Sequence, residues 1–402
     1  FYVIMVFMVH KLWVLDRVYL NPGEPLSALP SRVAAKLGCL PQDLASTRLL
    51  RKSLDARRKN RIFYVCRVAV GLRPKAPIKI PHPLLQPWEE PAPWQILPSA
   101  ERVPLRHPPL VIGAGPAGLF AAWTLATQGY RPLVVEQGLA MPDRVRQVHG
   151  FWTRQHPFSQ GASLLYGEGG AGTFSDGKLT GRCARSDESR YAEFFRLLLR
   201  CGAPESIAWE DYPHIGTDRL RAVVVRLRKA IEKAGGEVRF SCRLDDLQWE
   251  EGRLSAACVN GEWRPVGALV LATGYTAEET LKVLLARGGT LEARPFQMGL
   301  RIEHPQSFLD ERQHRGFAAA LPPARYLLKA HPAGQRDCYS FCMCPGGEIV
   351  CSSSRPERLS VNGMSFRRRD GKRGNSALVV PLLPADFPSA DPLAGMALVE
   401  QY

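Results

Sequence analysis

The chain has 402 residues, of which 45% are hydrophobic, so it can form two or three domains with sizeable cores, and general disorder is excluded. Its 53 basic residues outnumber its 38 acidic ones, and the net charge of +15 favours anionic partners such as phosphorylated cofactors, acidic substrates, RNA or an anionic membrane. Its ten cysteines lack the paired spacing of a zinc site and predict reduced thiols in a cytoplasmic protein.

The first nine residues, FYVIMVFMV, are apolar, but the run ends at His10 and Lys11. It is too short to span a bilayer, and it lacks the basic leader and the cleavage site of a signal peptide. We therefore predict no membrane span. Because the chain does not begin with methionine, we interpret this end as an irregular gene start, with Met5 or Met8 as alternatives.

Residues 1–73 are predicted to form a small α+β module. KLWVLDRVYL (11–20) and RIFYVCRVAVGL (61–72) have the composition of β-strands, and between them LSALPSRVAAKLG has helical spacing. The basic run RKSLDARRKNR (51–61) is interpreted as a solvated loop. Eleven of the 33 prolines lie in residues 74–109, so residues 74–104 are predicted to be an extended linker without a regular core element.

A dinucleotide-binding βαβ unit is predicted from residue 105 onward. In LVIGAGPAGLFAAWTLATQGYRPLVVEQG, Gly113 permits a sharp turn, Gly115 lets a pyrophosphate approach the backbone, and Gly118 lets the helix pack closely on the sheet. The N-terminus of a helix over about 117–128 would face the phosphates. Glu136, at the end of the second strand, would accept hydrogen bonds from a ribose diol.

Residues 218–274 continue this pattern with a helix, a strand, a β-meander and a buried strand that ends in Ala272, Thr273 and Gly274. This order is similar to that of many FAD oxidoreductases. The resemblance implies that Ala272 to Tyr275 line FAD, since small residues allow the cofactor to pass close to the main chain.

The stretch GEGGAGTFSDGKLTG (167–181) is not a flexible linker, because Phe174, Lys178 and Leu179 are interspersed among its glycines. It is not a magnesium-binding phosphate loop either, because Leu179 stands where Ser or Thr would follow the lysine. A flat aromatic ligand fits better, since glycine backbone N–H groups can reach the edge of an isoalloxazine ring and Lys178 can supply positive charge. Lys178 is equally compatible with a surface position.

Several long strings appear in one order along the chain: YGEGGAGTFSDGKL, PHIGTDRLR, FQMGLRIEHPQ, YSFCMCPGGEIV, VNGMS and NSALVV. With them the chain resembles the bacterial family of uncharacterised FAD-dependent dehydrogenases or oxidoreductases. The resemblance implies an α/β fold, with a Rossmann-like FAD-binding domain, an inserted α+β substrate domain and a small α+β N-terminal domain. The expected segments are 105–181 (βαβ unit and glycine loop), 182–267 (inserted helix and meander), 268–280 (return to the FAD domain) and 281–402 (substrate domain).

The expected function is that of a FAD-dependent oxidoreductase that transfers hydride through flavin N5. Only one complete dinucleotide fingerprint is present, with a strand before its GxGxxG and a helix after it. Electrons would therefore come from a small-molecule substrate, for which the charge suits an anion, or from NAD(P)H bound without its own Rossmann domain. No DNA partner is expected, and the catalytic residues are not identified. The cofactor-binding residues expected from these patterns and this resemblance are Gly113, Gly115, Pro116, Ala117, Gly118, Glu136, Gln137, Gly169, Gly170, Gly172, Thr173, Phe174, Ser175, Lys178, Ala272, Thr273, Gly274 and Tyr275.

Two departures from the family pattern bear on activity. Tyr275 stands where relatives have histidine, and the chain ends at AGMALVEQY, without the glycine-rich segment that closes over FAD in such proteins. We therefore expect a truncated chain that holds FAD weakly or not at all. Two alternatives remain open: an inactive flavoprotein fragment, and a flavin-binding RNA-associated protein, suggested by the basic stretches 51–61 and FRRRDGKRG (366–374).

Several further residues could take part in catalysis or binding, but each also has a structural explanation. Cys342 and Cys344 could form a redox pair or be buried, inert thiols. Arg301 and His304 could hold an anion or relay a proton, and a structural ion pair with Glu303 or another acid explains them equally well. His214 has no assigned role, and Thr217 or Asp218 is a candidate helix cap. No HExxH, GxSxG or metal-spaced Cys/His cluster occurs, which removes hydrolase and zinc chemistry.

Overall fold

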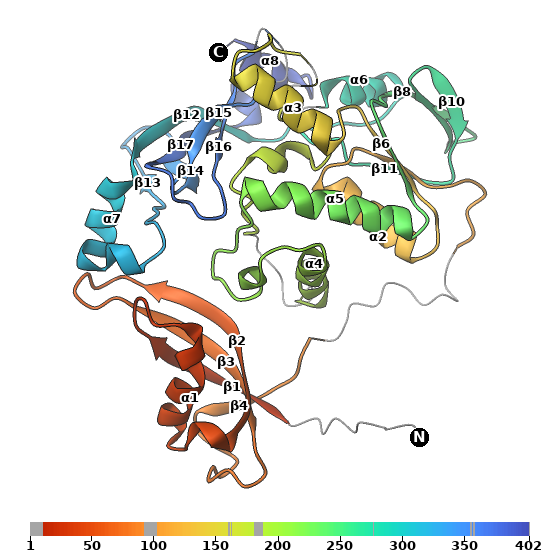
Figure 1. The fold of residues 1–402 in the computed structure, drawn as a ribbon. Helices are drawn as coiled ribbons and strands as arrows, with labels where there is room; N and C mark the ends of the chain where they lie inside the picture. Colours follow the sequence, from red (N-terminus) through yellow and green to blue (C-terminus); the bar gives the residue numbers. More distant parts are fainter. Residues whose placement is uncertain are drawn as a thin grey trace, which may run out of the picture.

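The computed structural model describes residues 11–91, 103–159, 161, 163–180, 188–275, 277–353, 356 and 358–401. It arranges them as an N-terminal sheet with one helix, a central α/β domain and a C-terminal region of antiparallel strands (Figure 1). The apolar opening run, Gly181 and Cys183 lie outside the described residues.

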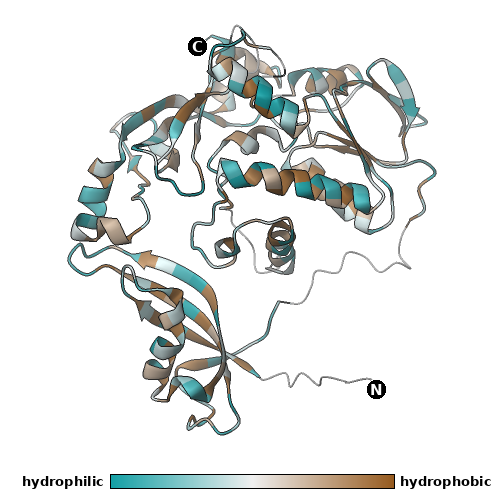
Figure 2. Cartoon of the chain, in the orientation of Figure 1, coloured by the Kyte–Doolittle hydropathy of each residue, from teal (hydrophilic) through white to brown (hydrophobic). Residues whose placement is uncertain are grey.

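The N-terminal domain is a four-stranded antiparallel sheet in the order β2-β3-β1-β4. Its strands are β1 (Leu12–Leu20), β2 (Leu44–Asp55), β3 (Phe63–Leu72) and β4 (Leu85–Trp88). The helix α1 (Leu29–Leu37) follows a 3-10 turn (Leu26–Ala28) and buries Leu29 and Val33 against the sheet. Figure 2 shows apolar and polar residues mixed along these strands.

Two expectations for this region are wrong. β2 runs to Asp55, so the first half of the basic run lies in a strand and not in a loop. The proline-rich segment contains β4, in which Leu85 is buried. β4 is an edge strand that pairs only with β1, and an edge position tolerates Pro87 because ladder hydrogen bonds are needed on one side only.

The central domain contains a four-stranded parallel sheet in the order β11-β5-β6-β7. Its strands are β5 (Leu110–Ile112), β6 (Leu133–Glu136), β7 (Glu237–Phe240) and β11 (Leu269–Leu271). Val111 and Val134 pack under the helices α2 (Pro116–Thr127), α4 (Glu188–Arg200) and α5 (Thr217–Lys233). On the opposite face, Ile112 and Val135 pack against the meander of β8 (Leu244–Glu250), β9 (Arg253–Val259) and β10 (Glu262–Pro265).

The structure differs from the expected organisation of residues 182–267. This segment does not form a separate inserted domain in its described part, because α5 packs against α2 and β7 is the fourth strand of the parallel sheet. The parallel pairing of β6 with β7 explains the difference, since a strand that follows a helix returns to the same sheet by a crossover connection. Residues 269–271 then return beside β5 as expected.

The C-terminal region forms a second antiparallel sheet in the order β12-β17-β14-β13, with a β15-β16 hairpin beside it. Its strands are β12 (Phe296–Pro305), β13 (Lys329–Ala330), β14 (Cys338–Cys344), β15 (Glu348–Cys351), β16 (Val361–Met364) and β17 (Arg373–Leu382). The remaining α-helices are α3 (Met141–Trp152), α6 (Glu278–Ala286), α7 (Gln306–His314) and α8 (Ala394–Glu400), and short 3-10 turns lie at Pro41–Asp43, Gly170–Phe174, Glu205–Ala208, Arg315–Ala320 and Pro384–Asp386. None of the helices within the described ranges combines the length and apolar character needed to cross a membrane.

Candidate functional site

The turn between β5 and α2 is compact. Gly113 has a φ of +105°, and a methyl group on it would lie 2.5 Å from the carbonyl oxygen of Ala272. A methyl group on Gly118 would overlap the carbonyl oxygen of Gly113. Both positions therefore require glycine, the first because of backbone conformation and contact, the second because the helix packs directly on the turn.

The N-terminus of α2 has the free donors of a phosphate site. No side chain caps the helix, and Gly115, Pro116 and Ala117 are partly or largely exposed. The first N–H groups of a helix have no intrahelical partner, and they carry the positive end of the helix dipole. Methyl groups on Gly172 or Gly274 would meet no atom within 4 Å, so these backbone positions also border open space. This cradle fits an anionic ligand that lies close to the main chain.

Glu136 is buried at the end of β6 and serves as a local anchor. Its Oε2 accepts a hydrogen bond from Ala114 N at 2.8 Å, and its Oε1 accepts bonds from Gly138 N at 2.8 Å and Gly167 N at 2.9 Å. The carboxylate thus ties the turn after β5 to the start of the glycine loop. A carboxylate has about four acceptor sites, so one remains for a ligand hydroxyl. Its expected contact with a ribose remains a prediction, as does the role of the exposed Gln137 next to it.

The glycine loop lies directly beside the start of α2. Gly169 N donates to Ala114 O at 2.8 Å, and a methyl group on Gly170 would lie 3.1 Å from the Cα of Gly115. The loop is ordered by its own contacts, including the bond from Gly177 N to Ser175 Oγ at 3.0 Å. The structure therefore brings together the fingerprint turn and the glycine loop, two segments that were both expected to bind the cofactor.

Two predicted cofactor residues, Thr173 and Phe174, have side chains inside the protein. Thr173 is fully buried, and its carbonyl oxygen accepts a hydrogen bond from Thr217 Oγ1 at 2.8 Å. The Phe174 ring packs edge-on against Trp152 and lies under the guanidinium of Arg144. Both residues are buried, so we attribute their side chains to the support of the loop.

A buried ionic cluster behind the loop was missed in the sequence analysis. Arg144 is 1% exposed and donates to the carbonyl oxygens of Glu168 and Leu164 at 2.7 and 2.9 Å. The Glu168 carboxylate accepts from Met141 N at 2.7 Å and from Arg228 Nε at 2.8 Å. Burial lowers the pKa of Arg144 to about 10. No local sequence pattern predicts this cluster, because its members come from α3, the glycine loop and α5.

The turn after β11 also borders the fingerprint. Ala272 N donates to Ile112 O at 2.8 Å, which fixes the turn beside Gly113. Gly274 has a φ of +75°, and Tyr275 is 75% exposed. Ala272, Thr273 and Gly274 therefore lie at the carboxyl end of the parallel sheet, next to the start of α2, where ligands of this architecture bind.

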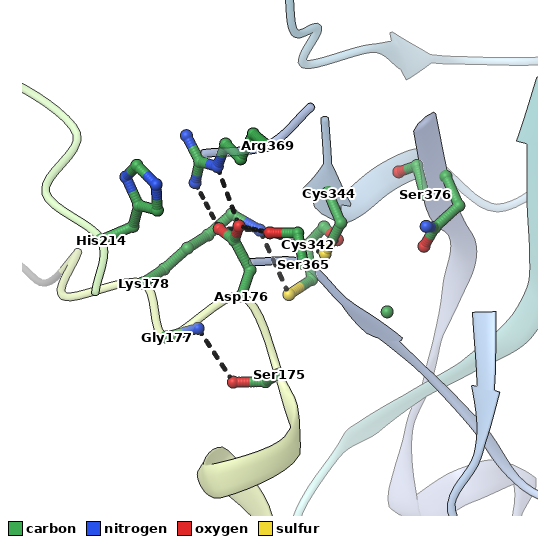
Figure 3. Close-up of polar contacts among 12 residues, drawn as sticks. Ser175, Asp176, Gly177, Lys178, His214, Cys342, Cys344, Ser365, Arg369 and Ser376 are labelled. Atoms are coloured by element: carbon green, nitrogen blue, oxygen red, sulfur yellow. Dashed lines mark hydrogen bonds and ion pairs between the residues drawn. The ribbon is translucent and has the colours of Figure 1, made fainter. Parts of the chain in front are cut away.

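The second half of the glycine loop is held by the C-terminal region (Figure 3). Asp176 is 1% exposed, and its Oδ1 accepts from Arg369 Nε at 2.9 Å. Arg369 Nη2 and the Ser365 hydroxyl make further hydrogen bonds to the same carboxylate, and Lys178 Nζ lies 3.2 Å from it. Although burial opposes ionisation, these partners hold the pKa of Asp176 well below its usual range.

The alternative that Lys178 is a surface lysine is wrong. Its Nζ is 3.8 Å from Cys342 Sγ and 3.5 Å from Cys344 Sγ, and its side chain is 25% exposed. Figure 3 shows the lysine between Asp176 and the two cysteines of β14. Its positive charge is thus directed to a carboxylate and two sulfurs of the protein.

His214 is buried beside Arg367. Its Nε2 lies 3.1 Å from Arg367 O, and its Nδ1 lies 3.0 Å from Arg367 Nη1. A neutral imidazole satisfies both contacts, because Nε2–H donates to the carbonyl and Nδ1 accepts from the guanidinium. Burial, reinforced by the charges of Arg369 and Arg367, lowers the pKa of His214 to about 4.

The expected helix cap is wrong. The residue that precedes α5 is Gly216, with no side-chain cap, and Thr217 is already helical. Asp218 instead accepts a hydrogen bond from Arg367 N at 2.8 Å. The Asp218 carboxylate thus binds a segment that is distant in sequence, and a local capping pattern cannot predict such a contact.

Arg301 and His304 also have structural partners. Arg301 Nη1 donates to Asn375 Oδ1 at 2.6 Å, and His304 Nε2 lies 2.9 Å from the Tyr326 hydroxyl. Glu303 pairs with Arg373 and not with either residue. In the basic stretch 366–374, Arg367 forms an ion pair with Glu210 at 3.0 Å, so two arginines of that stretch, Arg367 and Arg369, are used inside the protein.

A groove of about 480 Å³ lies between α2 and α4, with Pro116, Ala117 and Phe194 among its lining residues. Its walls are mainly apolar, and it includes neither the glycine loop nor the two cysteines of β14. We therefore place the candidate cofactor site at the fingerprint, the glycine loop and the 272–274 turn, and not in this groove.

Three family models match parts of the chain. A FAD-dependent protein, C-terminal domain-like family matches residues 295–402, an NAD(P)-binding Rossmann-like domain matches 111–167, and a domain of unknown function matches 17–71. An uncharacterized protein of Clostridium beijerinckii is 36% identical over 393 residues, which are 96% of this chain and 73% of the relative.

Solved structures with partial similarity include several enzymes. The chain is 18% identical to Thermovibrio ammonificans THI4, over 46% of this chain and 64% of that one, with a TM-score of 0.32. It is 14% identical to NikD, an unusual amino acid oxidase essential for nikkomycin biosynthesis, over 71% and 82% of the two chains, with a TM-score of 0.33. For L-proline dehydrogenase from P. horikoshii the identity is 14%, the coverage 50% and 62%, and the TM-score 0.28. The family assignment depends on the sequence relative and the domain matches.

Proposed function

The chain belongs to the family of FAD-dependent oxidoreductases that includes the Clostridium beijerinckii relative, and from this premise we propose that it transfers hydride between flavin N5 and a small organic substrate. The observation that carries the proposal is the cradle formed by the uncapped start of α2, the glycine loop and the turn at Ala272–Gly274. The basic balance of the chain favours an anionic substrate.

The residues present fit FAD. The backbone N–H groups at the start of α2 would hold the pyrophosphate, and the free acceptor site of Glu136 would take one ribose hydroxyl. The backbone at Gly170 and Gly172 and the turn at Ala272 would approach the cofactor without side-chain interference. Bound FAD supplies two-electron chemistry, and the protein residues would orient it and limit its contact with water.

NAD(P)H is a candidate electron donor under this proposal. The central sheet is built around one fingerprint, so a nicotinamide would bind in the open space next to the flavin site and not on a second Rossmann unit of its own. An organic substrate that delivers hydride directly is the alternative donor. The two differ in whether a nicotinamide alone bleaches the flavin.

The test is an anaerobic titration of the purified chain after incubation with FAD. Flavin that remains bound after desalting, and that NADH or NADPH bleaches, supports the proposal and identifies the donor. Bound flavin that only an organic compound bleaches also supports it and directs the search to that compound class. A folded chain that retains no flavin at saturating FAD contradicts the proposal, and circular dichroism establishes that the chain is folded.

A further inference from the structure

Two thiols lie side by side on β14, in contact with one lysine. Lys178 Nζ is within hydrogen-bonding range of both Cys342 Sγ (3.8 Å) and Cys344 Sγ (3.5 Å). A regular strand holds alternate side chains on one face but too far apart for an easy sulfur–sulfur bond. Here the ladder with β17 shifts register between Phe341 and Cys344, and Cys342 has a φ of +49°. Such a bulge bends the strand locally and departs from the regular placing of alternate side chains.

The two thiols differ in accessibility. Cys342 is partly exposed, whereas Cys344 is fully buried. The surroundings of Cys344 are tight, because a methyl group on Gly363 would lie 2.7 Å from its Sγ. An incoming reagent can therefore reach Cys342 first, while Cys344 stays in a fixed position behind it.

The charges around the pair favour a thiolate on Cys342. Lys178 and Arg301 bring positive charge to it, and the negative charge of Asp176 is balanced by Arg369. A hydrogen bond from Cys344, together with these cations, lowers the pKa of Cys342 to about 5 even though burial opposes the charge. The same coupling and burial raise the pKa of Cys344, which therefore keeps its proton.

We propose that Cys342 and Cys344 form a thiol–disulfide exchange pair, in which the accessible Cys342 attacks a small disulfide and the buried Cys344 resolves the product. The first step forms a bond between Cys342 Sγ and one sulfur of the substrate and releases the other as a thiolate. In the second step Cys344 gives up its proton to the released thiolate and attacks Cys342 Sγ. The second thiolate leaves and takes a proton from solvent, which replaces the one lost earlier by Cys342. The substrate disulfide is reduced to two thiols and the cysteine pair is oxidised to a disulfide, so electrons and protons balance.

Lys178 acts in this pair as a positioning residue. Its ammonium stabilises the Cys342 thiolate before attack, and its link to Asp176 at 3.2 Å fixes the ammonium between carboxylate and sulfurs. The inference does not rest on the proposed hydride transfer, because glutathione disulfide or another small disulfide supplies the oxidant.

The experiment uses glutathione disulfide as the probe and mass spectrometry as the readout. Tryptic peptide 337–358 carries four cysteines, so the measurement is made in a C338S/C351S background, where only the pair remains in that peptide. With both cysteines of the pair present, we expect the peptide to lose the mass of two hydrogen atoms. With C344S added, we expect glutathione to accumulate on Cys342, because the resolving thiol is gone. With C342S instead, we expect neither product.

Two results would overturn the proposal. One is a peptide that stays fully reduced in excess glutathione disulfide while both cysteines are present, a result that does not depend on the folding of a further variant. The other is a C344S protein in which Cys342 takes up glutathione no faster than Cys39 or Cys242, two further partly exposed thiols of the described residues, which serve as internal references.

The role of Lys178 has a separate readout in the alkylation of Cys342 by iodoacetamide. In the parent protein the rate should reach its plateau above a midpoint near pH 5. In K178M the midpoint should rise, and the rate at pH 6 should fall about tenfold. K229M, at an exposed lysine on α5, is the matched control and should leave the profile unchanged. An unchanged profile in K178M would remove the lysine from the proposal.

Discussion

Gly115 is the residue at which the cofactor assignment can be tested most directly. Its φ of −74° suits any L-residue, and a methyl group there would meet only the Cα of Gly170, at 3.9 Å. Gly115→Ala should therefore fold normally. The methyl group would however occupy the approach of a pyrophosphate to the start of α2, so we expect at least a tenfold loss of FAD affinity, about 1.4 kcal/mol. Isothermal titration with FAD measures the change.

Gly316→Ala is the control for this variant. Gly316 lies outside the proposed site, and a methyl group on it also meets no atom within 4 Å. It should leave FAD affinity unchanged. Equal affinities for the parent protein and both variants would show that the backbone at Gly115 does not approach the cofactor.

His214 should make stability depend on pH in a defined window. Its folded-state pKa is about 4, whereas an unfolded histidine titrates near ~6.5. The unfolded chain therefore binds the extra proton first as the pH falls. The stabilisation is fully present above pH ~6.5 and is lost progressively down to pH ~4, by up to about 3 kcal/mol. Urea unfolding at a series of pH values measures it.

His214→Gln supplies the comparison, since its amide can still donate to Arg367 O but does not titrate. The difference in unfolding free energy between parent and variant should shrink as the pH falls from 6.5 to 4. A difference that stays constant through this range would mean that His214 is already protonated in the fold, or that its pKa is unperturbed. His314, whose pKa burial also lowers, is present in both proteins and cancels from the comparison.

At the level of elements, β4 should be necessary for the N-terminal domain. Leu85 is buried in that domain's core, while its neighbour Leu84 is 44% exposed. Leu85→Ala should cost about 2–4 kcal/mol of unfolding free energy, and Leu84→Ala less than about 0.5 kcal/mol. Thermal unfolding monitored by circular dichroism compares the pair. Equal effects would mean that the proline-rich segment is a mere connector, as its composition indicated.

Elements with a strong local pattern were predictable from the sequence. The βαβ fingerprint gave α2 and the end of β6 to within about one residue, and the apolar stripe of residues 220–231 gave α5. β4 was not predictable, because proline content argues against a strand unless the strand is known to lie at an edge. The place of β7 in the parallel sheet was missed for a similar reason, since pairing with β6 is a contact between distant segments.

The same division holds for the candidate site. Gly113 and Gly118 could be predicted, because backbone conformation and close approach restrict these two positions to glycine. Asp176 and Arg369 could not, since they are 193 residues apart and nothing near either one indicates its partner. The orientation of Lys178 toward two sulfurs likewise depends on where β14 lies relative to the loop.

Across the whole molecule, segments distant in sequence close around the glycine loop. Asp176 and its neighbours contact the C-terminal region through Arg369 and Ser365, and Thr217 at the start of α5 donates to Ser365 O at 3.0 Å. The N-terminal sheet is attached by a different junction, where Lys52 N donates to Trp209 O at 2.8 Å. The central domain is thus the part to which both others bind, and the loop is one of the places where the C-terminal region does so.

This arrangement predicts that the Asp176–Arg369 pair couples the stability of the C-terminal region to that of the central domain. Arg369→Gln leaves a buried carboxylate without its main partner, so we expect a loss of about 3 kcal/mol and the separation of one unfolding transition into two. Arg368→Gln, at the exposed neighbouring arginine, should change stability by less than about 0.5 kcal/mol. Calorimetry resolves the transitions.

Because the Asp176 carboxylate is ionised in the fold above its depressed pKa, the effect of Arg369→Gln should be complete at neutral pH and diminish only below pH ~4, where the unfolded chain takes up the proton first. A single transition with an unchanged midpoint in Arg369→Gln would mean that the Asp176–Arg369 pair does not couple the two regions and that their other contacts suffice.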